Sequence, residues 1–315
     1  MDLAVIIITW NARDFIAGAL TSLQTDLSTS GLDAQLIVLD NASQDGTADL
    51  IKQQFPDVTL LAENENLGFT RGNNKALAYL GFGAHKALNQ LPKAVYLLNP
   101  DTLTQPGATA QLYSTLFSEE KNALVGAKLN YEDGTFQHSA FHFPGLKQLW
   151  TEFFPTPGRL IEGSFNGRYP PSLYEGQQAF EVDFVLGATM MLRSEALQTV
   201  GLLDESFFMY CEELDLAWRL HKAGWSVLCD PQAHVTHLEG RSSSQIRPQA
   251  TRYLWESRLK LFQRYYPVWK YKIATHLIVR GFQKRLKDLN SVPMDPELKS
   301  QLHQSYLHII QLAQA

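Results

Sequence analysis

Three carboxylates lie within four residues at the start of a predicted helix. They are Glu212, Glu213 and Asp215, and they directly follow a cluster of aromatic residues. At helical pitch Glu212, Asp215 and Arg219 share one face, whereas Glu213 points elsewhere. Glu213 is therefore either a general base or part of an ordinary acidic first turn that complements the helix dipole.

Polar residues also follow three predicted strands in the first half of the chain. Thr9-Trp10-Asn11 ends the first strand, Asp40-Asn41-Ala42-Ser43 the second, and Asn99-Pro100-Asp101 the fourth. In parallel α/β sheets, ligands bind beyond the carboxyl ends of the strands. The second and third clusters are also good turn formers, but together the three predict a binding site at one edge of a sheet.

The elements that would position these residues alternate between buried strands and amphipathic helices. Strands are predicted over residues 3–9, 35–39, 58–62, 94–98 and 180–186, and helices over 12–24, 47–55 and 70–80. This spacing predicts right-handed βαβ units and an α/β fold with a mostly parallel central sheet flanked by helices.

The sequence contains neither the G-x-G-x-x-G dinucleotide fingerprint nor a P-loop. Instead, Gly68 permits close backbone approach at the start of a helix, and Arg71 could pair with a phosphate. Asp40 could accept a hydrogen bond from a nucleoside base or a ribose hydroxyl. Asp101 is a carboxylate that suits Mg²⁺ or Mn²⁺, whose shell a phosphate and water would complete.

Composition excludes several classes of protein. The chain has 315 residues and a formal net charge of -5, which argues against a nucleic-acid binder. Its two cysteines indicate no disulfide framework and fit a reducing compartment. No apolar run reaches the roughly 18 residues that span a bilayer. We therefore expect a cytoplasmic protein that is soluble or peripheral at the inner face of the cell membrane.

These residues resemble the family 2 inverting nucleotide-sugar glycosyltransferases, which have the GT-A fold. Within that family the chain is most similar to rhamnosyltransferase-like enzymes of bacterial cell-surface polysaccharide synthesis. The resemblance covers roughly residues 3–267. It rests on the three strand-end clusters, Asn64–Phe69, Gly187–Arg193, Val200–Phe208, Glu212–Arg219, Gly224-Trp225, Pro231 and His237.

The resemblance implies a nucleoside-diphosphate sugar donor and a divalent metal, Mg²⁺ or Mn²⁺. Asn99-Pro100-Asp101 stands where many members have Asp-X-Asp, so the metal-binding carboxylate maps onto Asp101 and Asn99 replaces the first acid. His237 matches a histidine near the diphosphate or metal, with a role in the core as the alternative. The donor-binding set is Thr9, Asn11, Asp40, Gly68, Arg71, Asn99 and Asp101.

The catalytic base of the family is the second acid of a Glu-Asp or Asp-Asp pair, which maps onto Glu213. Because the usual Asp is a Glu in this chain, Glu212 and Asp215 stay open as alternatives. We expect Asp215 to pair with Arg219 or another basic group. Inverting transfer needs one general base and charge stabilisation of the departing diphosphate.

The predicted domains are a GT-A glycosyltransferase domain at residues 1–267 and a C-terminal helical extension at 268–315. Residues 141–180 are rich in Pro, Gly and aromatic residues and predict a long loop or short hairpins. This segment either shapes the acceptor site or is a poorly ordered insertion. From Arg252 onward, basic and aromatic residues alternate. This pattern predicts either a peripheral contact with an anionic membrane or a helix packed on the core with a solvated basic face.

The sequence therefore predicts an inverting glycosyltransferase that moves a sugar, with rhamnose as a candidate, to a glycan or lipid-linked acceptor. Two alternatives stay open. One is a degenerate, non-catalytic nucleotide-sugar-binding partner at the membrane, suggested by Asn99 and by Glu at the base position. The other is a sugar nucleotidyltransferase, although such an enzyme would carry a Gly- and Arg-rich loop after its first strand. Oligomerisation is left open.

Overall fold

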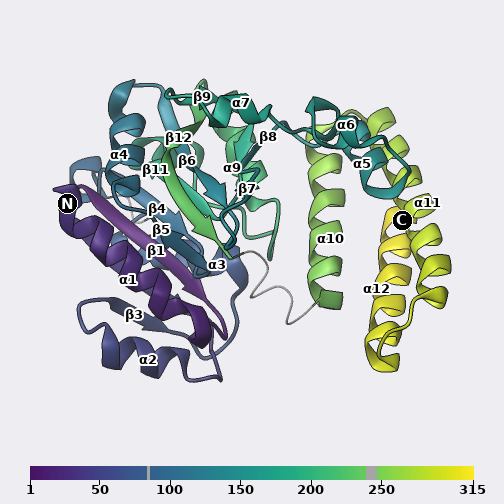
Figure 1. Ribbon diagram of the computed structural model, residues 1–315, viewed down its shortest axis with the longest axis horizontal. Helices are drawn as coiled ribbons and strands as arrows, with labels where there is room; N and C mark the ends of the chain where they lie inside the picture. The colour runs from purple at the N-terminus through teal and green to yellow at the C-terminus, as the bar shows by residue number, and fades with distance from the viewer. Residues whose placement is uncertain (84–85, 239–246) are drawn as a thin grey trace. The chain divides into compact units, whose positions relative to one another are not determined.

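The structure is a computed structural model that describes residues 1–83, 86–238 and 247–315. The chain forms two compact units, each with its own hydrophobic core (Figure 1). Unit 1 contains Met1–His142, Tyr169–Phe208 and the chain from Glu212 through the last strand. Unit 2 contains Phe143–Arg168, Met209–Cys211 and the helices that follow that strand.

Unit 1 is built on a ten-stranded sheet with the main order β3-β2-β1-β4-β11-β6-β12-β5. β7 pairs with β6, β9 pairs with β12, and β8 and β10 form a separate two-stranded sheet. The strands are β1 (Leu3–Thr9), β2 (Ala34–Asp40), β3 (Thr59–Ala62), β4 (Ala94–Leu98), β5 (Thr102–Thr104), β6 (Asn122–Asn130), β7 (Phe136–Gln137), β8 (Ala140–Phe141), β9 (Phe180–Glu181), β10 (Phe184–Val185), β11 (Thr189–Arg193) and β12 (Ser226–His237).

The predicted parallel strands are present in the first half of this sheet. β1 pairs in parallel with both β2 and β4, and β2 pairs in parallel with β3. All seven residues of β1 are buried, as expected for a central strand covered on both faces. The carboxyl ends of β1, β2 and β4 therefore meet at one edge. β11, which the sequence did not predict to be antiparallel, runs opposite to β4 and β6.

Helices cover both faces of the sheet. On one face, Val5 and Ile7 of β1 pack into a core with α1 and α4. On the other face, Ile8 packs against Gly72 of α3. A Cβ at Gly72 would lie only 3.1 Å from Ile8 Cγ2. The helices of unit 1 are α1 (Arg13–Ser30), α2 (Thr47–Gln54), α3 (Gly68–Leu80), the 3₁₀ helix η1 (Leu88–Gln90), α4 (Ala108–Ser118), α7 (Pro171–Tyr174), α8 (Ser194–Val200) and α9 (Glu212–Lys222).

Unit 2 is helical (Figure 1). Its helices are α5 (Leu146–Phe153), α6 (Gly158–Ile161), the 3₁₀ helix η2 (Ser164–Asn166), α10 (Arg247–Tyr265), α11 (Val268–Ser291) and α12 (Pro296–Gln314). Its core joins Phe153 of α5, Trp255 of α10 and Phe282 of α11. Gly281 leaves room for this packing, because a Cβ there would overlap the Phe153 ring at 2.2 Å.

Three expectations about the elements differ from the structure. Residues 141–180 contain α5, α6, η2 and α7 and are not a long loop or hairpins, because apolar side chains such as Leu149 and Phe153 pack into the core of unit 2. The strand expected over 180–186 is divided into β9 and β10. Helix α10 belongs to unit 2, so the division differs from the predicted boundary at residue 267.

Within the described residues, no helix is long and apolar enough to cross a membrane.

Candidate active site

The end of β2 is a hydrogen-bonded turn that also holds the end of β1. Both carboxylate oxygens of Asp40 accept from Ser43: Oδ2 from its backbone N–H at 3.0 Å and Oδ1 from its hydroxyl at 2.5 Å. The Ser43 hydroxyl in turn accepts from Asn11 N at 2.8 Å, and Asn11 Oδ1 accepts from Gln44 N at 2.9 Å. The turn considered for Asp40 is therefore present, and it brings Asn11 and Asp40 together.

A buried amide ties this edge to helix α3. The Asn41 side chain donates to Gly68 O at 3.2 Å and accepts from Leu67 N at 3.3 Å, while its backbone N–H donates to Thr9 O at 2.8 Å. The hydroxyl of Thr9 is buried and has no hydrogen-bond partner within the described chain. Thr9 therefore contributes its carbonyl to the edge and does not expose its side chain.

Gly68 makes the close backbone approach that its residue type predicted, but to a different partner. Its φ is +77°, and a Cβ at this position would lie 2.7 Å from Phe208 O. The next residue, Phe69, donates its N–H to the same carbonyl at 3.2 Å. The start of α3 is therefore packed against the segment that leads to the acidic helix α9, and this packing by itself requires glycine here.

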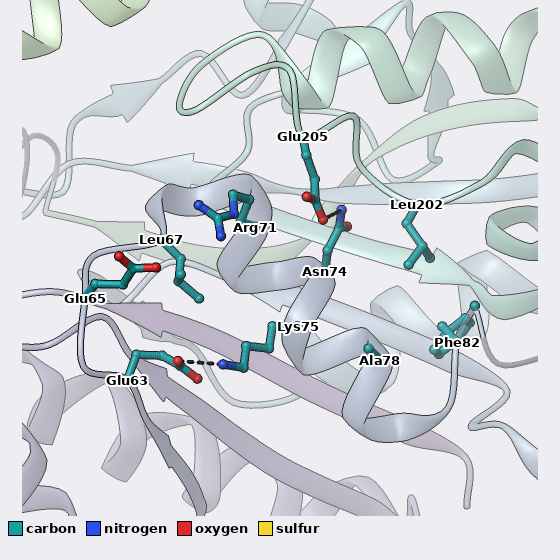
Figure 2. A pocket seen from close by; sticks show the side chains of 11 residues that line it. Glu63, Glu65, Leu67, Arg71, Asn74, Lys75, Ala78, Phe82, Leu202 and Glu205 are labelled. Carbon is teal, nitrogen blue, oxygen red and sulfur yellow. Dashed lines mark hydrogen bonds and ion pairs between the residues drawn. The ribbon is translucent and has the colours of Figure 1, made fainter.

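Arg71 lies on the exposed side of α3 and lines an open groove of about 650 Å³. Figure 2 shows Arg71 and Lys75 on this helix with glutamates on both sides of it. Lys75 pairs with Glu63 at 2.6 Å, and Asn74 donates to Glu205 at 3.0 Å. Of the predicted site residues, Arg71 alone appears in the lining of this groove.

Asp101 and His237 lie side by side although they are far apart in the sequence. His237 Nε2 is 3.5 Å from Asp101 Oδ1, and both side chains are buried. Strand pairing fixes the pair, because His237 is in register with Thr102 across β12 and β5, and Leu238 N donates to Asp101 O at 2.9 Å. His237 Nδ1 lies 3.3 Å from Gln137 Oε1, which orients the ring.

These two side chains fit a divalent cation that is bound together with a diphosphate. Among the described residues, no group of three or more His, Cys, Asp or Glu side chains is placed to hold a metal ion. Mg²⁺ and Mn²⁺ sites at phosphate substrates need one or two protein carboxylates and take their other ligands from phosphate and water. The Asp101 side chain is a carboxylate of this kind, and the His237 imidazole lies beside it.

The two glutamates in the first turn of α9 differ in burial. Glu212 is 5% exposed, and its Oε2 has no hydrogen-bond partner among the described residues. Burial, and secondly the charge of Glu213, raise the pKa of Glu212 well above its usual range. Burial therefore favours the protonated form of Glu212. Glu213 is half-buried, and its carboxyl carbon would lie 3.9 Å from a Cβ placed on Gly187.

One short segment connects this carboxylate to the Asn99–Asp101 turn. Gly187 faces Glu213, and the carbonyl of the next residue, Ala188, accepts from Asn99 N at 3.0 Å. The Asn99 carbonyl accepts from the Thr102 hydroxyl at 2.7 Å, which closes the turn that carries Asp101. The small residues Gly187 and Ala188 therefore join the two halves of the candidate site.

Asp215 makes the ion pair that the sequence predicted. Its side chain is completely buried and binds Arg219 Nε at 2.8 Å. The Arg219 guanidinium also donates to the carbonyls of Val200, Gly201 and Leu202 at 2.7, 3.1 and 2.9 Å. Asp215 and Arg219 thus fasten the loop after α8 to α9.

Backbone strain is concentrated at the same places. Four described non-glycine residues have positive φ: Asn11 (48°), Ala42 (57°), Tyr210 (69°) and Cys211 (67°). Two follow β1 and β2, and two directly precede Glu212. Such conformations persist only where the surroundings enforce them, and they cluster at functional sites.

The sequence matches the description "Glycosyltransferase like family 2" over residues 2–254, most of the chain. The chain belongs to glycosyltransferase family 2. Two rhamnosyltransferases are similar to it. The N-acetylglucosaminyl-diphospho-decaprenol L-rhamnosyltransferase of Mycobacterium tuberculosis is 29% identical over 249 residues, which cover 77% of this chain and 78% of that protein. Rhamnosyltransferase WbbL of Escherichia coli K12 is 25% identical over 201 residues, or 62% and 70%.

Solved structures support the GT-A fold of this glycosyltransferase. The mannosyltransferase PcManGT from Pyrobaculum calidifontis, solved with GDP-Man and Mn²⁺, aligns with a TM-score of 0.57 and 14% identity. The alignment covers 98% of this chain and 86% of that structure.

The carboxylates of the candidate site could be recognised in the sequence of this glycosyltransferase. Most of the amide side chains that bond the surrounding segments could not. Asn74 was such an omission: its amide accepts from Leu203 N at 3.1 Å and donates to Leu203 O at 2.8 Å. Gln137 is comparable, since its Oε1 lies 3.3 Å from His237 Nδ1. These amides bind backbone or side chains many residues away, and no local spacing rule marks them.

Proposed function

We propose that this glycosyltransferase transfers a sugar, with rhamnose as the first candidate, from a nucleoside-diphosphate donor to a glycan or lipid-linked acceptor with inversion at the anomeric carbon. The observation that carries the proposal is the junction at Gly187-Ala188. Gly187 faces the Glu213 carboxylate, and the carbonyl of Ala188 accepts a hydrogen bond from Asn99 N in the Asn99–Asp101 turn. The dipeptide thus contacts both groups, which are more than 100 positions apart in the sequence.

The donor would bind at the edge formed by β1, β2 and β4. Asn11 and Asp40 lie together there, where a nucleoside can be recognised by hydrogen bonds beyond the strand ends. Asp101 and His237 would hold Mg²⁺ or Mn²⁺ with the diphosphate. When bound, the metal supplies positive charge that stabilises the departing nucleoside diphosphate. Thr9, Gly68, Arg71 and Asn99 stay in the donor-binding set as predictions.

Glu213 would act as the general base. Of the three candidate carboxylates, Glu212 is buried, which raises its pKa, and Asp215 is bonded to Arg219. Glu213 is half-buried and faces Gly187. In the transfer step the acceptor oxygen attacks the anomeric carbon while the bond to the diphosphate oxygen breaks. The hydroxyl proton passes to Glu213, and the nucleoside diphosphate leaves with the bonding electrons.

The acceptor is inferred from relatives and from chemistry. The mycobacterial relative is named for N-acetylglucosaminyl-diphospho-decaprenol, a sugar on a lipid diphosphate. We propose an acceptor of this class, with its hydroxyl at Glu213 and its lipid at a membrane surface. The direct test incubates the protein with deoxythymidine-diphosphate or uridine-diphosphate rhamnose, an N-acetylglucosaminyl-diphospho-polyprenol and Mn²⁺. The anomeric configuration of the product is then read by NMR.

Inverted product that depends on the divalent metal is the expected result. Donor binding in a thermal-shift assay without transfer to any acceptor of this class would favour a non-catalytic nucleotide-sugar-binding partner. Formation of nucleoside-diphosphate sugar from a nucleoside triphosphate and a sugar phosphate would instead support a nucleotidyltransferase.

Helix α11 offers a surface for the membrane contact. Its inner face packs Ala274, Ile278 and Phe282 into the core of unit 2. Val268 and Trp269 at its first turn are 69% and 61% exposed, the two highest values among the large apolar side chains of the described chain. We call the exposed side of α11 its outer face. After Val268 and Trp269 it contains exposed residues at helical spacing: Lys272, Ile273, His276, Arg280, Lys284 and Lys287.

The packed-helix alternative accounts for part of this basic segment. Arg258 and Arg285 are used inside unit 2, where they pair with Glu152 at 3.2 and 2.8 Å. The cations of the α11 outer face stay exposed, and their last turn carries one acid, Asp288. Exposed apolar residues next to cations match the chemistry of an anionic lipid surface, which we propose as its partner.

Vesicle co-sedimentation tests this surface. The protein should bind phosphatidylglycerol vesicles more tightly than phosphatidylcholine vesicles, and binding should weaken with salt. W269A/I273A and K272Q/R280Q should both reduce binding. The matched controls on unit 1 are Y79A, which removes a 54% exposed aromatic ring, and K52Q/K121Q, which removes the same charge. Equal loss in the controls, or binding that ignores lipid charge, would contradict the proposal.

A further inference from the structure

Gln137 of β7 is a buried amide beside the Asp101–His237 pair. It is 3% exposed, and its Oε1 lies 3.3 Å from His237 Nδ1. Sheet pairing fixes its place, because Gln137 is in register with Leu129 of β6, and β6 also pairs with β12, the strand of His237. All of these residues belong to unit 1. The same sheet therefore holds both the imidazole and the amide that it faces.

The two ring nitrogens of His237 face two different oxygens. Nδ1 faces Gln137 Oε1, and Nε2 is 3.5 Å from Asp101 Oδ1. A neutral imidazole has one N–H, so one nitrogen donates and the other offers a lone pair. With the hydrogen on Nε2, the ring can donate to Asp101 but has no lone pair on that side for a cation. With the hydrogen on Nδ1, Gln137 accepts it, and the Nε2 lone pair and the Asp101 carboxylate lie side by side.

We propose that Gln137 is a positioning residue for the divalent metal. By accepting the Nδ1 hydrogen, its amide oxygen leaves His237 Nε2 to bind the cation beside Asp101. The hydrogen bond made by one ring nitrogen decides which nitrogen binds a metal, and loss of such a partner costs about 10–100-fold in metal affinity. This role rests on the metal site of the proposed function.

The choice of nitrogen also bears on which metal is bound. Mg²⁺ takes oxygen ligands and keeps several waters, whereas imidazole is a ligand of transition metals. A site in which His237 Nε2 is a ligand should therefore favour Mn²⁺ over Mg²⁺ more than a site with Asp101 alone. Loss of the Gln137 oxygen should weaken Mn²⁺ binding more than Mg²⁺ binding.

The chain contains a matched control in the same sheet. Asn122 at the start of β6 is also a 3% exposed amide, and its side chain donates to Thr115 O of α4 at 3.0 Å. Asn122 and Gln137 thus share burial and functional group, but Asn122 bonds a helix at the other end of β6 from Leu129. A general loss of packing in the sheet should affect leucine variants of both residues alike.

The experiment compares Q137L, Q137E and N122L with the wild type. Mn²⁺ binding is measured by the electron paramagnetic resonance of free Mn²⁺, and Mg²⁺ binding by competition. Both use deoxythymidine or uridine diphosphate, whichever raises the melting temperature of the wild type more. Q137L should raise the Kd for Mn²⁺ about 10–100-fold and the Kd for Mg²⁺ by less. Q137E keeps an acceptor oxygen at the same length and should recover most of the Mn²⁺ affinity.

Melting temperatures of Q137L and N122L show how much stability each loses, and Gln137→Met replaces Q137L if the leucine variant does not fold. The inference is overturned if the variant without the amide binds Mn²⁺ as the wild type does, if N122L loses as much Mn²⁺ affinity, if Q137E is no better, or if Mg²⁺ binding falls equally. A wild-type protein that binds no Mn²⁺ with either nucleotide would instead count against the proposed metal site, so the two failures are distinguishable.

Discussion

The donor edge and the base segment are built by different means. At the donor edge, Asn11, Asp40 and Ser43 bond one another over two adjacent strand ends, and the strands themselves fix the spacing. The base segment from Phe207 to Glu213 has no strand to support it. It depends on the contact with α3 and on the ion pair inside α9. The proposed donor edge is thus preformed by the sheet, whereas the proposed base segment is held by contacts with distant parts of the chain.

The largest effect is expected at the end of the base segment. Glu213→Gln keeps the shape of the side chain but cannot accept the proton, so transfer should fall about 10²–10⁴-fold. Donor binding by thermal shift should not change, because the donor edge is separate. Glu195→Gln, on the exposed first turn of α8, is the control. Near-wild-type turnover in E213Q would remove the base assignment and with it the contrast between the two regions.

A smaller loss is expected at the donor edge. Asp101→Asn should lower kcat/KM about 10²–10³-fold through lost metal-assisted charge stabilisation of several kcal/mol. The variant should also lose the Mn²⁺-dependent part of its thermal shift with the donor. Asn99→Asp, which restores an Asp-X-Asp pattern, should retain transfer. If D101N still responds to Mn²⁺ as the wild type does, Asp101 does not hold the metal.

Gly68→Ala tests the place where the two regions meet. The added Cβ would overlap Phe208 O, and the φ of +77° is unfavourable for alanine, so the free energy of unfolding should fall by about 1–3 kcal/mol. Gly31→Ala is the control, since Gly31 has a φ of +70° and nothing within 4 Å of a Cβ. Its cost should be about 1 kcal/mol. Urea denaturation of both variants measures the difference, and equal losses would show that contact with Phe208 is unimportant.

The smallest effect concerns the pH dependence of stability. Because the folded pKa of Glu212 is raised above 4.5, the folded state holds a proton that the unfolded chain releases, and stability falls as pH rises above that value. Glu212→Gln lacks this ionisation. Relative to wild type it should therefore gain about 1 kcal/mol in the free energy of unfolding between about pH 5 and pH 7. Urea titrations at both pH values measure this gain, and a constant difference would show that Glu212 is ionised when folded.

The same contrast explains what the sequence could predict. Strands β1, β2 and β4 and their polar ends follow from local apolar runs and turn residues, so Asn11, Asp40 and Asp101 were recognisable. Asp215 and Arg219 are one helical turn apart, and their ion pair followed from spacing. The Asp101–His237 contact depends on the pairing of β5 with β12, and its proximity came only from family resemblance.

The parts that were missed depend on contacts over long separations. Trp255, Leu259 and Phe262 lie in a helix that the sequence placed in the first domain and that belongs to unit 2 in the structure. Asn74 bonds Leu203, 129 residues later. Tyr210 and Cys211 adopt positive φ although their side chains disfavour it, and no pattern of residue types announces that conformation.

The interleaving of the two units limits how this enzyme can be divided for expression or grafting. A gene ending near residue 267 would keep α5 and α10 but delete α11 and α12, and so leave Phe153 and Trp255 without most of their core partners. Joining residue 142 to 169 would remove α5 from the same core. Because Met209–Cys211 belongs to the helical unit yet lies inside the catalytic polypeptide, no single cut yields an intact transferase module. Chimeras with other transferases would have to exchange all segments of a unit together.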